Sequence, residues 1–338
     1  MTRFITISED PPNREVPLSS LAVGTSSPFY VRSIFPIPQL DADIWSLTVG
    51  GAVDRPVSLS LAELRSLPFT EQVVTLECAG NGRSLMDPVP EGVPWGLGAV
   101  STARFGGTRL EAVLEQVEPS AAAEDYVFTG ADRGNVHPDG DIIYAFRLAA
   151  SQTDRALLVW EMNGNPLPAE HGYPVRLLVP GHYGMQSVKW LTSITALESR
   201  FEGHFPRKYR YFGDPTAEEG EPVGPIRVRS VITEPASGAE LPLGPVTVRG
   251  LAWSGQGSIA SVEVGTGPQS RHAARMGEPE GPYAALSWEW TFDPPSRGVF
   301  RLSAKASDAA GHVQPEDPIW NRHGYGNNFV HEIEITIV

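Results

Sequence analysis

The residue best suited to do chemistry is Cys78, the only cysteine among the 338 residues of the chain. A run of apolar and β-branched residues at 72–76 predicts a buried strand that delivers Cys78 to a turn. The turn, Ala79-Gly80-Asn81-Gly82, consists of small residues that would let the backbone approach a bulky ligand closely. Arg83 follows, and a positive charge near the sulfur would favour the thiolate, which is the metal-binding form.

Residue types alone leave more than one role open for Cys78. A lone cysteine forms no internal disulfide and is often a small buried apolar residue. Zinc is disfavoured, because no second cysteine or histidine lies at zinc spacing. A nucleophilic cysteine would need a nearby histidine, and no spacing selects one from His137, His171 and His182. A functional thiolate and a packing role therefore both remain open at this point.

Composition narrows the classes of partner. The formal net charge of −14 argues against nucleic acid and anionic lipid as ligands. The chain contains no apolar run of about 18 residues, so no membrane-spanning helix is predicted. The first ten residues lack the basic and apolar regions of a secretory signal, so we expect a cytoplasmic protein. A periplasmic location stays open if a leader precedes Met1 in the natural chain.

The chain is longer than one hydrophobic core usually organises, so two domains are expected. We expect an irregular arm at residues 1–27 and a mixed α+β domain at 28–213, with capped helices starting near Ser60 and Thr108. A Pro- and Gly-rich linker is expected at 214–225. Closely spaced strand patterns at 226–338 predict an all-β sandwich of the immunoglobulin type.

A set of motifs occurs in order along the chain. The motifs are Leu76-Glu77-Cys78-Ala79-Gly80-Asn81-Gly82-Arg83-Ser84 and residues 101–107, 161–168, 171–181, 188–191 and 318–321. Together they resemble the sulfite oxidase and plant nitrate reductase family, from about residue 28 to the end of the chain. The resemblance implies a molybdenum and molybdopterin cofactor, and a homodimer formed through the immunoglobulin-like domain. The resemblance is to a haem-free, bacterial-type member of the family, since we find neither a haem-binding domain nor room for one in this sequence.

The resemblance also implies roles for individual residues. Cys78 falls at the position of the thiolate ligand of molybdenum. The expected pterin-binding residues are His171, Arg176, Gly184, Ser187 and Lys189. The expected substrate-site and catalytic residues are Arg32, Arg83, Trp95, Tyr209 and His323. Tyr211 competes with Tyr209 for the active-site tyrosine, and His323 stands where the family places an arginine. Glu91 also stands where animal members have a lysine. The pocket is therefore expected to be less cationic, and His323 is expected to titrate near neutrality.

Three functions follow as hypotheses. The first is oxidation of sulfite, a small anionic substrate, to sulfate, with electrons passing to an external acceptor such as a cytochrome. The second is reduction of nitrate, a sulfoxide or another oxo compound, with His323 as a proton donor. The third is a non-catalytic binding protein on a degenerate scaffold, against which the retention of Cys78, Arg176 and Lys189 argues.

Overall fold

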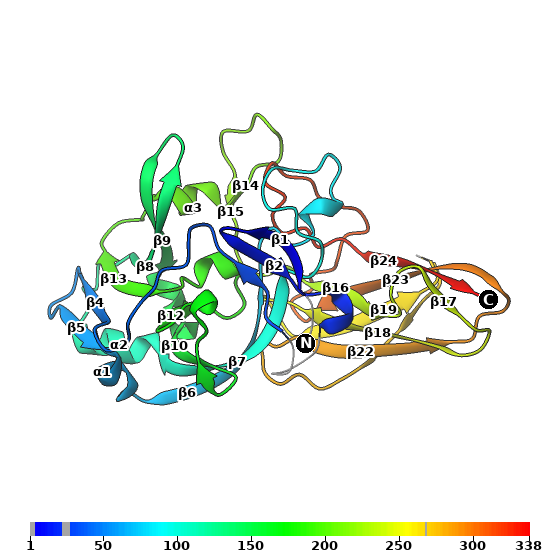
Figure 1. Ribbon diagram of the computed structural model, residues 1–338, viewed down its shortest axis with the longest axis horizontal. Helices are drawn as coiled ribbons and strands as arrows, with labels where there is room; N and C mark the ends of the chain where they lie inside the picture. Colours follow the sequence, from blue (N-terminus) through cyan, green and yellow to red (C-terminus); the bar gives the residue numbers. More distant parts are fainter. Residues whose placement is uncertain (1–3, 22–27, 268) are drawn as a thin grey trace.

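The computed structural model describes residues 4–21, 28–267 and 269–338 and shows two lobes (Figure 1). The larger lobe contains the sheets and helices of the first part of the chain. The narrower lobe consists of strands from the last part, and the C-terminus lies at its far end. The pocket described below is built within the larger lobe, close to the junction.

Two five-stranded sheets form the centre of the larger lobe. The first has the order β5-β4-β13-β8-β9, formed by Val57–Ser60, Ser46–Gly51, Leu191–Leu197, Asp125–Val136 and Gly140–Ala149. The second has the order β11-β10-β7-β6, formed by Asn165–Pro166, Leu157–Met162, Val100–Arg109 and Phe69–Glu77, with β12 (Arg176–Leu178) also paired to β10. Only β4 and β13 pair in parallel within these two sheets of the described chain.

The N-terminal segment is more regular than expected. A three-stranded sheet contains β1 (Ile5–Glu9), β2 (Pro12–Glu15) and β3 (Val31–Arg32). Val16 is buried in the core of the larger lobe, and its amide donates to the carbonyl of Gly98. The prediction of an irregular arm is therefore wrong for residues 5–9 and 12–15, which pair as antiparallel strands, and Leu18–Ser20 form a 3₁₀ helix. Residues 1–3 and 22–27 of that arm lie outside the described residues.

Helices contribute little to the fold. The α-helices are α1 (Leu61–Arg65), α2 (Leu110–Val117) and α3 (His204–Lys208), and short 3₁₀ helices occupy Leu18–Ser20, Arg83–Leu85, Ala150–Arg155, Ala169–His171 and Gly184–Gln186. The capping box predicted at Ser60 is confirmed. The one predicted at Thr108 is wrong: the N-cap of α2 is Arg109 without a side-chain cap, and the Thr108 hydroxyl donates to the carbonyl of Pro68. The prediction of α+β thus holds only in part, because the lobe is mostly strand.

The narrower lobe contains two sheets packed around one apolar core. One has the order β16-β18-β22-β21, formed by Arg229–Glu234, Val246–Trp253, Leu286–Phe292 and Arg275–Met276. The other has the order β17-β24-β23-β19-β20, formed by Ala239–Leu241, His331–Ile337, Gly298–Asp308, Ile259–Gly265 and Arg271–Ala273. Val248, Leu302 and Ile335 are fully buried in the core of this sandwich. Alternating burial along β24 shows why the sequence pattern predicted strands here.

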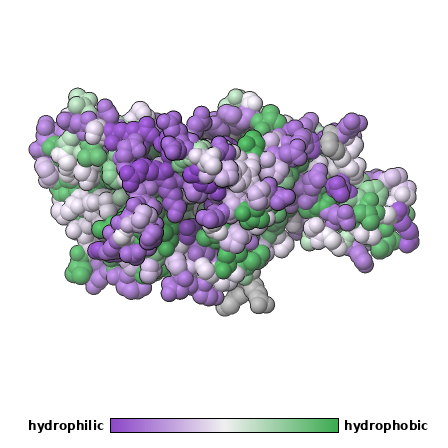
Figure 2. Space-filling model, turned by 90° about the horizontal axis from the view of Figure 1, so that it is seen from above, coloured by the Kyte–Doolittle hydropathy of each residue, from purple (hydrophilic) through white to green (hydrophobic). Residues whose placement is uncertain are grey.

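The two lobes share apolar packing at their junction. Within the expected linker, β15 (Glu221–Pro222) pairs with β14 (Arg210–Tyr211), and Val223 is buried. The core of the larger lobe also contains Ile226, Leu251 and Trp253 from the narrower one. Seen from above, the surface of the larger lobe is largely hydrophilic (Figure 2). No helix among the described residues is long and apolar enough to cross a membrane.

Candidate active site

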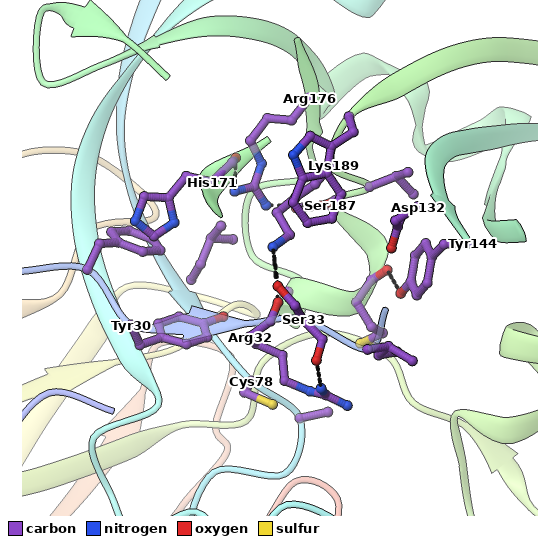
Figure 3. A pocket seen from close by; sticks show the side chains of 18 of the residues that line it. Tyr30, Arg32, Ser33, Cys78, Asp132, Tyr144, His171, Arg176, Ser187 and Lys189 are labelled. Atoms are coloured by element: carbon purple, nitrogen blue, oxygen red, sulfur yellow. Dashed lines mark hydrogen bonds between the residues drawn. The ribbon is translucent and has the colours of Figure 1, made fainter. Parts of the chain in front are cut away.

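One pocket collects most of the residues singled out from the sequence (Figure 3). The expected site residues that line it are Arg32, Cys78, His171, Arg176, Gly184, Ser187, Lys189 and Tyr209. They come from β3, from the loop after β6, from the segment between the 3₁₀ helix Ala169–His171 and β13, and from the residue after α3. Chain segments far apart in sequence therefore converge on one cavity.

Cys78 lies at the end of β6, half-buried in the pocket wall. Its amide donates to the carbonyl of Ala99 at 2.9 Å, which fixes the start of the turn. The glycines of the turn lie close to arginine side chains. A Cβ on Gly80 would lie 2.4 Å from the guanidinium of Arg83, and one on Gly82 would lie 2.7 Å from that of Arg229. These glycines therefore make room for arginine side chains of the protein.

A second wall of the pocket is cationic and is held by backbone carbonyls. The guanidinium of Arg176 donates to the carbonyls of His171 and Ser187, each at 3.0 Å. Burial, together with the positive charges of Lys189 and Arg176, lowers the pKa of His171 to about 3. His171 is therefore neutral at pH 7, while Arg176 keeps its charge. The hydroxyl of Ser187 accepts from the amide of Val179 at 3.0 Å and anchors the loop to the end of β12.

Lys189 ties two of these segments together. Its Nζ donates to the carbonyls of Arg32 at 3.0 Å and Glu170 at 2.8 Å, and it lies 4.1 Å from the ring centroid of Trp190. Burial and the charge of Arg176 lower its pKa. Trp190 has a φ of +51°, which non-glycine residues seldom adopt. Its indole donates to the carbonyl of Ala169 at 2.7 Å, and this bond helps to hold the turn.

Sequence reasoning missed three polar residues of the pocket, namely Tyr30, Asp132 and Tyr144. Asp132 is buried, and its Oδ1 has no hydrogen-bond partner within the described chain. Burial raises its pKa to about 6, against the opposing charge of Lys189. It lies in β8 where the pairing with β9 is irregular between Thr129 and Arg133. No local sequence pattern predicts such an irregularity, so no signal selected Asp132.

Tyr209 and not Tyr211 lines the pocket. The ring of Tyr209 lies 5.2 Å from that of Tyr325, and its hydroxyl shares a hydrogen bond with Tyr144. Burial raises the pKa of Tyr209; Arg32 lowers it and Cys78 raises it further, so both charges lie close to this phenol. Tyr211 instead packs under the guanidinium of Arg227, 4.4 Å from its ring centroid.

The remaining expected residues, Arg83, Trp95 and His323, are not among those that line this pocket. Arg83 and His323 pack against Tyr325, at 5.6 and 5.4 Å from its ring centroid. The Nε of Arg83 also donates to the carbonyl of His323 at 2.8 Å. Trp95 is fully buried, and its carbonyl accepts from the hydroxyl of Ser84 at 2.9 Å, which braces the turn after Cys78.

The expected titration near neutrality is not supported for His323. Its pKa is lowered, first by burial and then by the charges of Lys208, Arg322 and Arg83, with only Glu91 acting in the opposite sense. The imidazole is therefore neutral at pH 7. Lys208, next to Tyr209, is a further cationic residue that the sequence did not single out. Burial and the charges of Arg32 and Arg83 lower its pKa.

The residues that line the pocket suit an anionic group that also carries N–H donors and a soft metal. Arg32, Arg176 and Lys189 supply positive charge, and the unpartnered Oδ1 of Asp132 supplies an acceptor for a bound N–H. Cys78 supplies a thiolate, which soft metals prefer. No group of three or more His, Cys, Asp or Glu side chains in the described part of the chain could hold a metal by itself. An external chelator is therefore consistent with this site.

Family profiles match both lobes of the chain. A family described as "Oxidoreductase molybdopterin binding domain" matches residues 34–205. A second, described as "Mo-co oxidoreductase dimerisation domain", matches residues 222–338.

Curated relatives align along nearly the whole chain. Sulfite oxidase of Gallus gallus is 37% identical and aligns with 94% of this chain and 74% of its own length. Sulfite oxidase of Arabidopsis thaliana is 32% identical, with 98% and 93% covered. Mitochondrial sulfite oxidase of Mus musculus is 36% identical over 98% of this chain, which spans 65% of the mouse protein.

A solved structure has the same fold. The sulfane dehydrogenase SoxCD from Paracoccus pantotrophus superposes with a TM-score of 0.85 at 24% identity, covering 96% of this chain and 84% of that chain. At this level of identity the likeness concerns the fold. It extends over both lobes, and so the relative arrangement of the lobes is shared.

Proposed function

The chain belongs to the sulfite oxidase family of molybdopterin oxidoreductases, and we propose that it oxidises sulfite to sulfate and passes two electrons to an external acceptor. The observation that carries the proposal is the convergence of Cys78, Arg32, Arg176 and Lys189 on one pocket. Three buried or half-buried cations beside a thiol suit an anionic chelate and an anionic substrate.

Cys78 is proposed as the protein ligand of the metal, and the cationic wall as the cradle of the pterin. Arg176, Lys189, His171, Gly184 and Ser187 line the part of the pocket suited to the pterin and its phosphate. His171 is neutral, so it can donate or accept a hydrogen bond without adding charge. When bound, the molybdenum-pterin group supplies oxygen-atom transfer and accepts two electrons.

The substrate side is proposed to lie between Arg32 and the aromatic pair Tyr209 and Tyr325. Arg32 lines the pocket, and its guanidinium donates to Asn13 at 3.0 Å and to the carbonyl of Ser33, so its direction is fixed. A fixed guanidinium can bind an oxyanion with little loss of side-chain entropy. Tyr209 keeps its proton at neutral pH and can donate a hydrogen bond to an anionic oxygen.

The proposed role of the three expected residues that do not line the pocket is to support it. They are Arg83, Trp95 and His323. Arg83 lies against Tyr325 and next to the Cys78 turn, and its positive charge reaches Tyr209. Trp95 braces the turn, and His323 fixes Arg83 through its backbone carbonyl. The neutral imidazole of His323 means that the cations Arg32, Arg83 and Lys208 supply the charge for a dianion.

We further propose the domain limits 28–213 and 226–338, with a linker at 214–225. The family profiles at 34–205 and 222–338 support them. The sandwich of the second domain is proposed to be immunoglobulin-like and to form a homodimer, in keeping with the dimerisation profile. The net charge of −14 favours an electron acceptor with a basic face, such as a cytochrome.

The proposal is tested by steady-state oxidation of sulfite with ferricyanide, on protein shown by metal analysis to be fully loaded with molybdenum. Turnover that saturates with sulfite is expected, and a fully loaded sample without turnover would reject the proposal. The nitrate reductase of Hordeum vulgare, which is 32% identical over 97% of this chain, motivates a second assay. Dithionite-reduced protein that nitrate or a sulfoxide reoxidises, but that sulfite cannot re-reduce, would favour the reductase instead.

A further inference from the structure

A buried cluster centred on Glu77 lies directly behind the Cys78 turn and outside the pocket lining. Both oxygens of the Glu77 carboxylate are used. Oε1 accepts from Arg229 Nη1 at 2.6 Å and from Asn81 Nδ2 at 2.9 Å, and Oε2 accepts from Trp253 Nε1 at 2.9 Å. Arg229 and Trp253 belong to β16 and β18 of the narrower lobe. The residue next to Cys78 is therefore held by the other lobe.

The same lobe also contacts the backbone of the turn. Arg229 Nη1 donates to the carbonyl of Asn81 at 3.3 Å, and Asn327 Nδ2 donates to that of Gly82 at 2.7 Å. The amide of Gly326 donates to the carbonyl of Ala79 at 2.7 Å. These contacts reach Ala79, Asn81 and Gly82 of the turn. Glycine suits position 82 because its φ is +83°, and a Cβ there would also lie 2.7 Å from Nη2 of Arg229.

The ion pair is not explained by stability alone. The side chains of Glu77 and Arg229 are each 2% exposed. Desolvation of two such charges largely cancels their attraction, so apolar residues of similar volume would hold the lobes together at least as well. A fully hydrogen-bonded carboxylate does provide a fixed direction, because every partner constrains it. Fixed geometry is what the neighbour of a metal ligand requires.

We infer that Glu77, Arg229 and Trp253 form an interdomain cluster of positioning residues, which sets the orientation of the Cys78 turn from the narrower lobe. This lobe then completes the ligand loop of the larger one, beyond any part it plays in dimerisation. The inference rests on the proposed function only for the identity of the metal. The orientation of the thiol can be measured without it.

The test compares substitutions in the cluster with matched substitutions elsewhere in the same lobe. Trp253→Phe removes one donor to Glu77 and leaves the ion pair intact, so this variant is the mildest. Arg229→Lys keeps the charge and loses the planar guanidinium. The controls are Trp290→Phe, in a tryptophan stacked on Phe292, and Arg249→Lys, in an arginine whose ion pairs with Glu234 and Glu289 are exposed.

The first measurement is the rate at which iodoacetamide alkylates the full-length chain produced without cofactor. Cys78 is the only cysteine, so the signal needs no assignment. The second is retention of molybdenum, and the sulfur-to-molybdenum absorption band, in loaded protein. We expect both cluster variants to change the alkylation rate and to shorten molybdenum retention by about 10-fold, as loss of an outer-shell partner does. Both controls should match the original protein.

A purely structural role gives a different result. Trp253→Phe would then lower the urea midpoint while the folded protein kept its alkylation rate, absorption band and metal retention, and this outcome would overturn the inference. If Arg229→Lys does not fold, Trp253→Phe alone decides. Failure of the proposed function is seen separately, since an original chain that never binds molybdenum still reports the alkylation rates.

Discussion

At the scale of single residues, the site depends on groups whose charge the surroundings fix. Burial and the neighbouring cations Lys189 and Arg176 keep His171 neutral. Arg176, which donates to the carbonyls of His171 and Ser187, stays charged. Tyr209 stays protonated beside Arg32 and Cys78. The pocket thus combines the permanent positive charge of its arginines with neutral donors. That combination binds an anion strongly.

Cys78→Ser is expected to abolish molybdenum binding. A hydroxyl is a poor substitute for a thiolate on a soft metal, so we expect turnover to fall by at least ~100-fold, more than loss of an outer-shell partner costs. Metal analysis and sulfite oxidation on the same preparation would check this. A variant that kept its molybdenum and its turnover would refute the role of Cys78.

Tyr209→Phe and Tyr211→Phe form a matched pair two residues apart. Loss of a hydrogen bond to an anionic group costs about 1.5–3 kcal/mol, which corresponds to roughly a 10- to 100-fold lower kcat/KM for Tyr209→Phe. Tyr211 packs under Arg227, outside the pocket, so its variant should stay within a few-fold of the original. Steady-state kinetics decide, and the reverse order would move the role to Tyr211.

At the scale of elements, the strands place the site and the short helices close its edges. β6 carries the chain to Glu77 and pairs with β7 along its whole length, from Phe69 opposite Thr108 to Glu77 opposite Val100. β12 pairs with β10 and delivers Arg176. Because both strands belong to one sheet, the thiol and the cationic wall are fixed relative to each other.

The helix α1 depends on its N-cap, since it has only five residues.

Ser60→Ala is expected to destabilise the protein by about 1 kcal/mol through loss of the N-cap. The hydroxyl of Ser60 accepts from the amide of Glu63 at 3.3 Å, and the Glu63 carboxylate accepts from the amide of Ser60 at 2.7 Å. Ser58→Ala, on the exposed side of β5, is the control. Urea unfolding measures both, and equal effects would argue against the capping box.

At the scale of the whole molecule, the two lobes behave as one structure around the Cys78 turn. Their apolar packing is shared through Ile226, Leu251 and Trp253, and buried polar contacts join Glu77 to the narrower lobe. Three histidines with lowered pKa values are distributed over both lobes. Burial lowers the pKa of His171 to about 3 and those of His182 and His331 to about 4.

Stability of the cofactor-free chain is expected to fall as the pH drops from about 6.5 towards 4. In this range the unfolded chain protonates these histidines and the folded chain does not, so protons favour unfolding. Asp132, with a pKa raised to about 6, and Glu15, whose pKa is raised by burial, oppose the effect, whereas His323, whose pKa is lowered, adds to it.

His331→Asn tests this prediction. Nδ1 of His331 accepts from the amide of Ile232 at 2.9 Å, and the asparagine oxygen can replace it without titrating. Between pH 7 and pH 5 the variant should lose about 1 to 2 kcal/mol less free energy of unfolding than the original chain. Equal losses in urea titrations at the two pH values would contradict the assignment.

The sequence by itself determined the local patterns and the family. The strand patterns at 226–338 predicted an all-β region, and the structure has strands there such as Val246–Trp253 and Leu286–Phe292, because burial of one face acts on neighbouring residues. The motifs around Cys78 and further along the chain, and their likeness to a known family, indicated the cofactor and several residues of the pocket. Strand pairing in the N-terminal segment was not predicted, although Asp10-Pro11 marks the turn between β1 and β2. The third strand, β3, pairs with β2 from much further along the chain.

Only the tertiary structure decided which side chains meet. Asp132 enters the pocket through an irregular strand pairing, and Tyr209 was separated from Tyr211 by position and not by type. The glycines of the Cys78 turn accommodate arginines, one of them from the other lobe. Arg229 lies 152 residues from Glu77 in sequence. Contacts at such separations depend on how sheets pack, which no local pattern of residue types encodes.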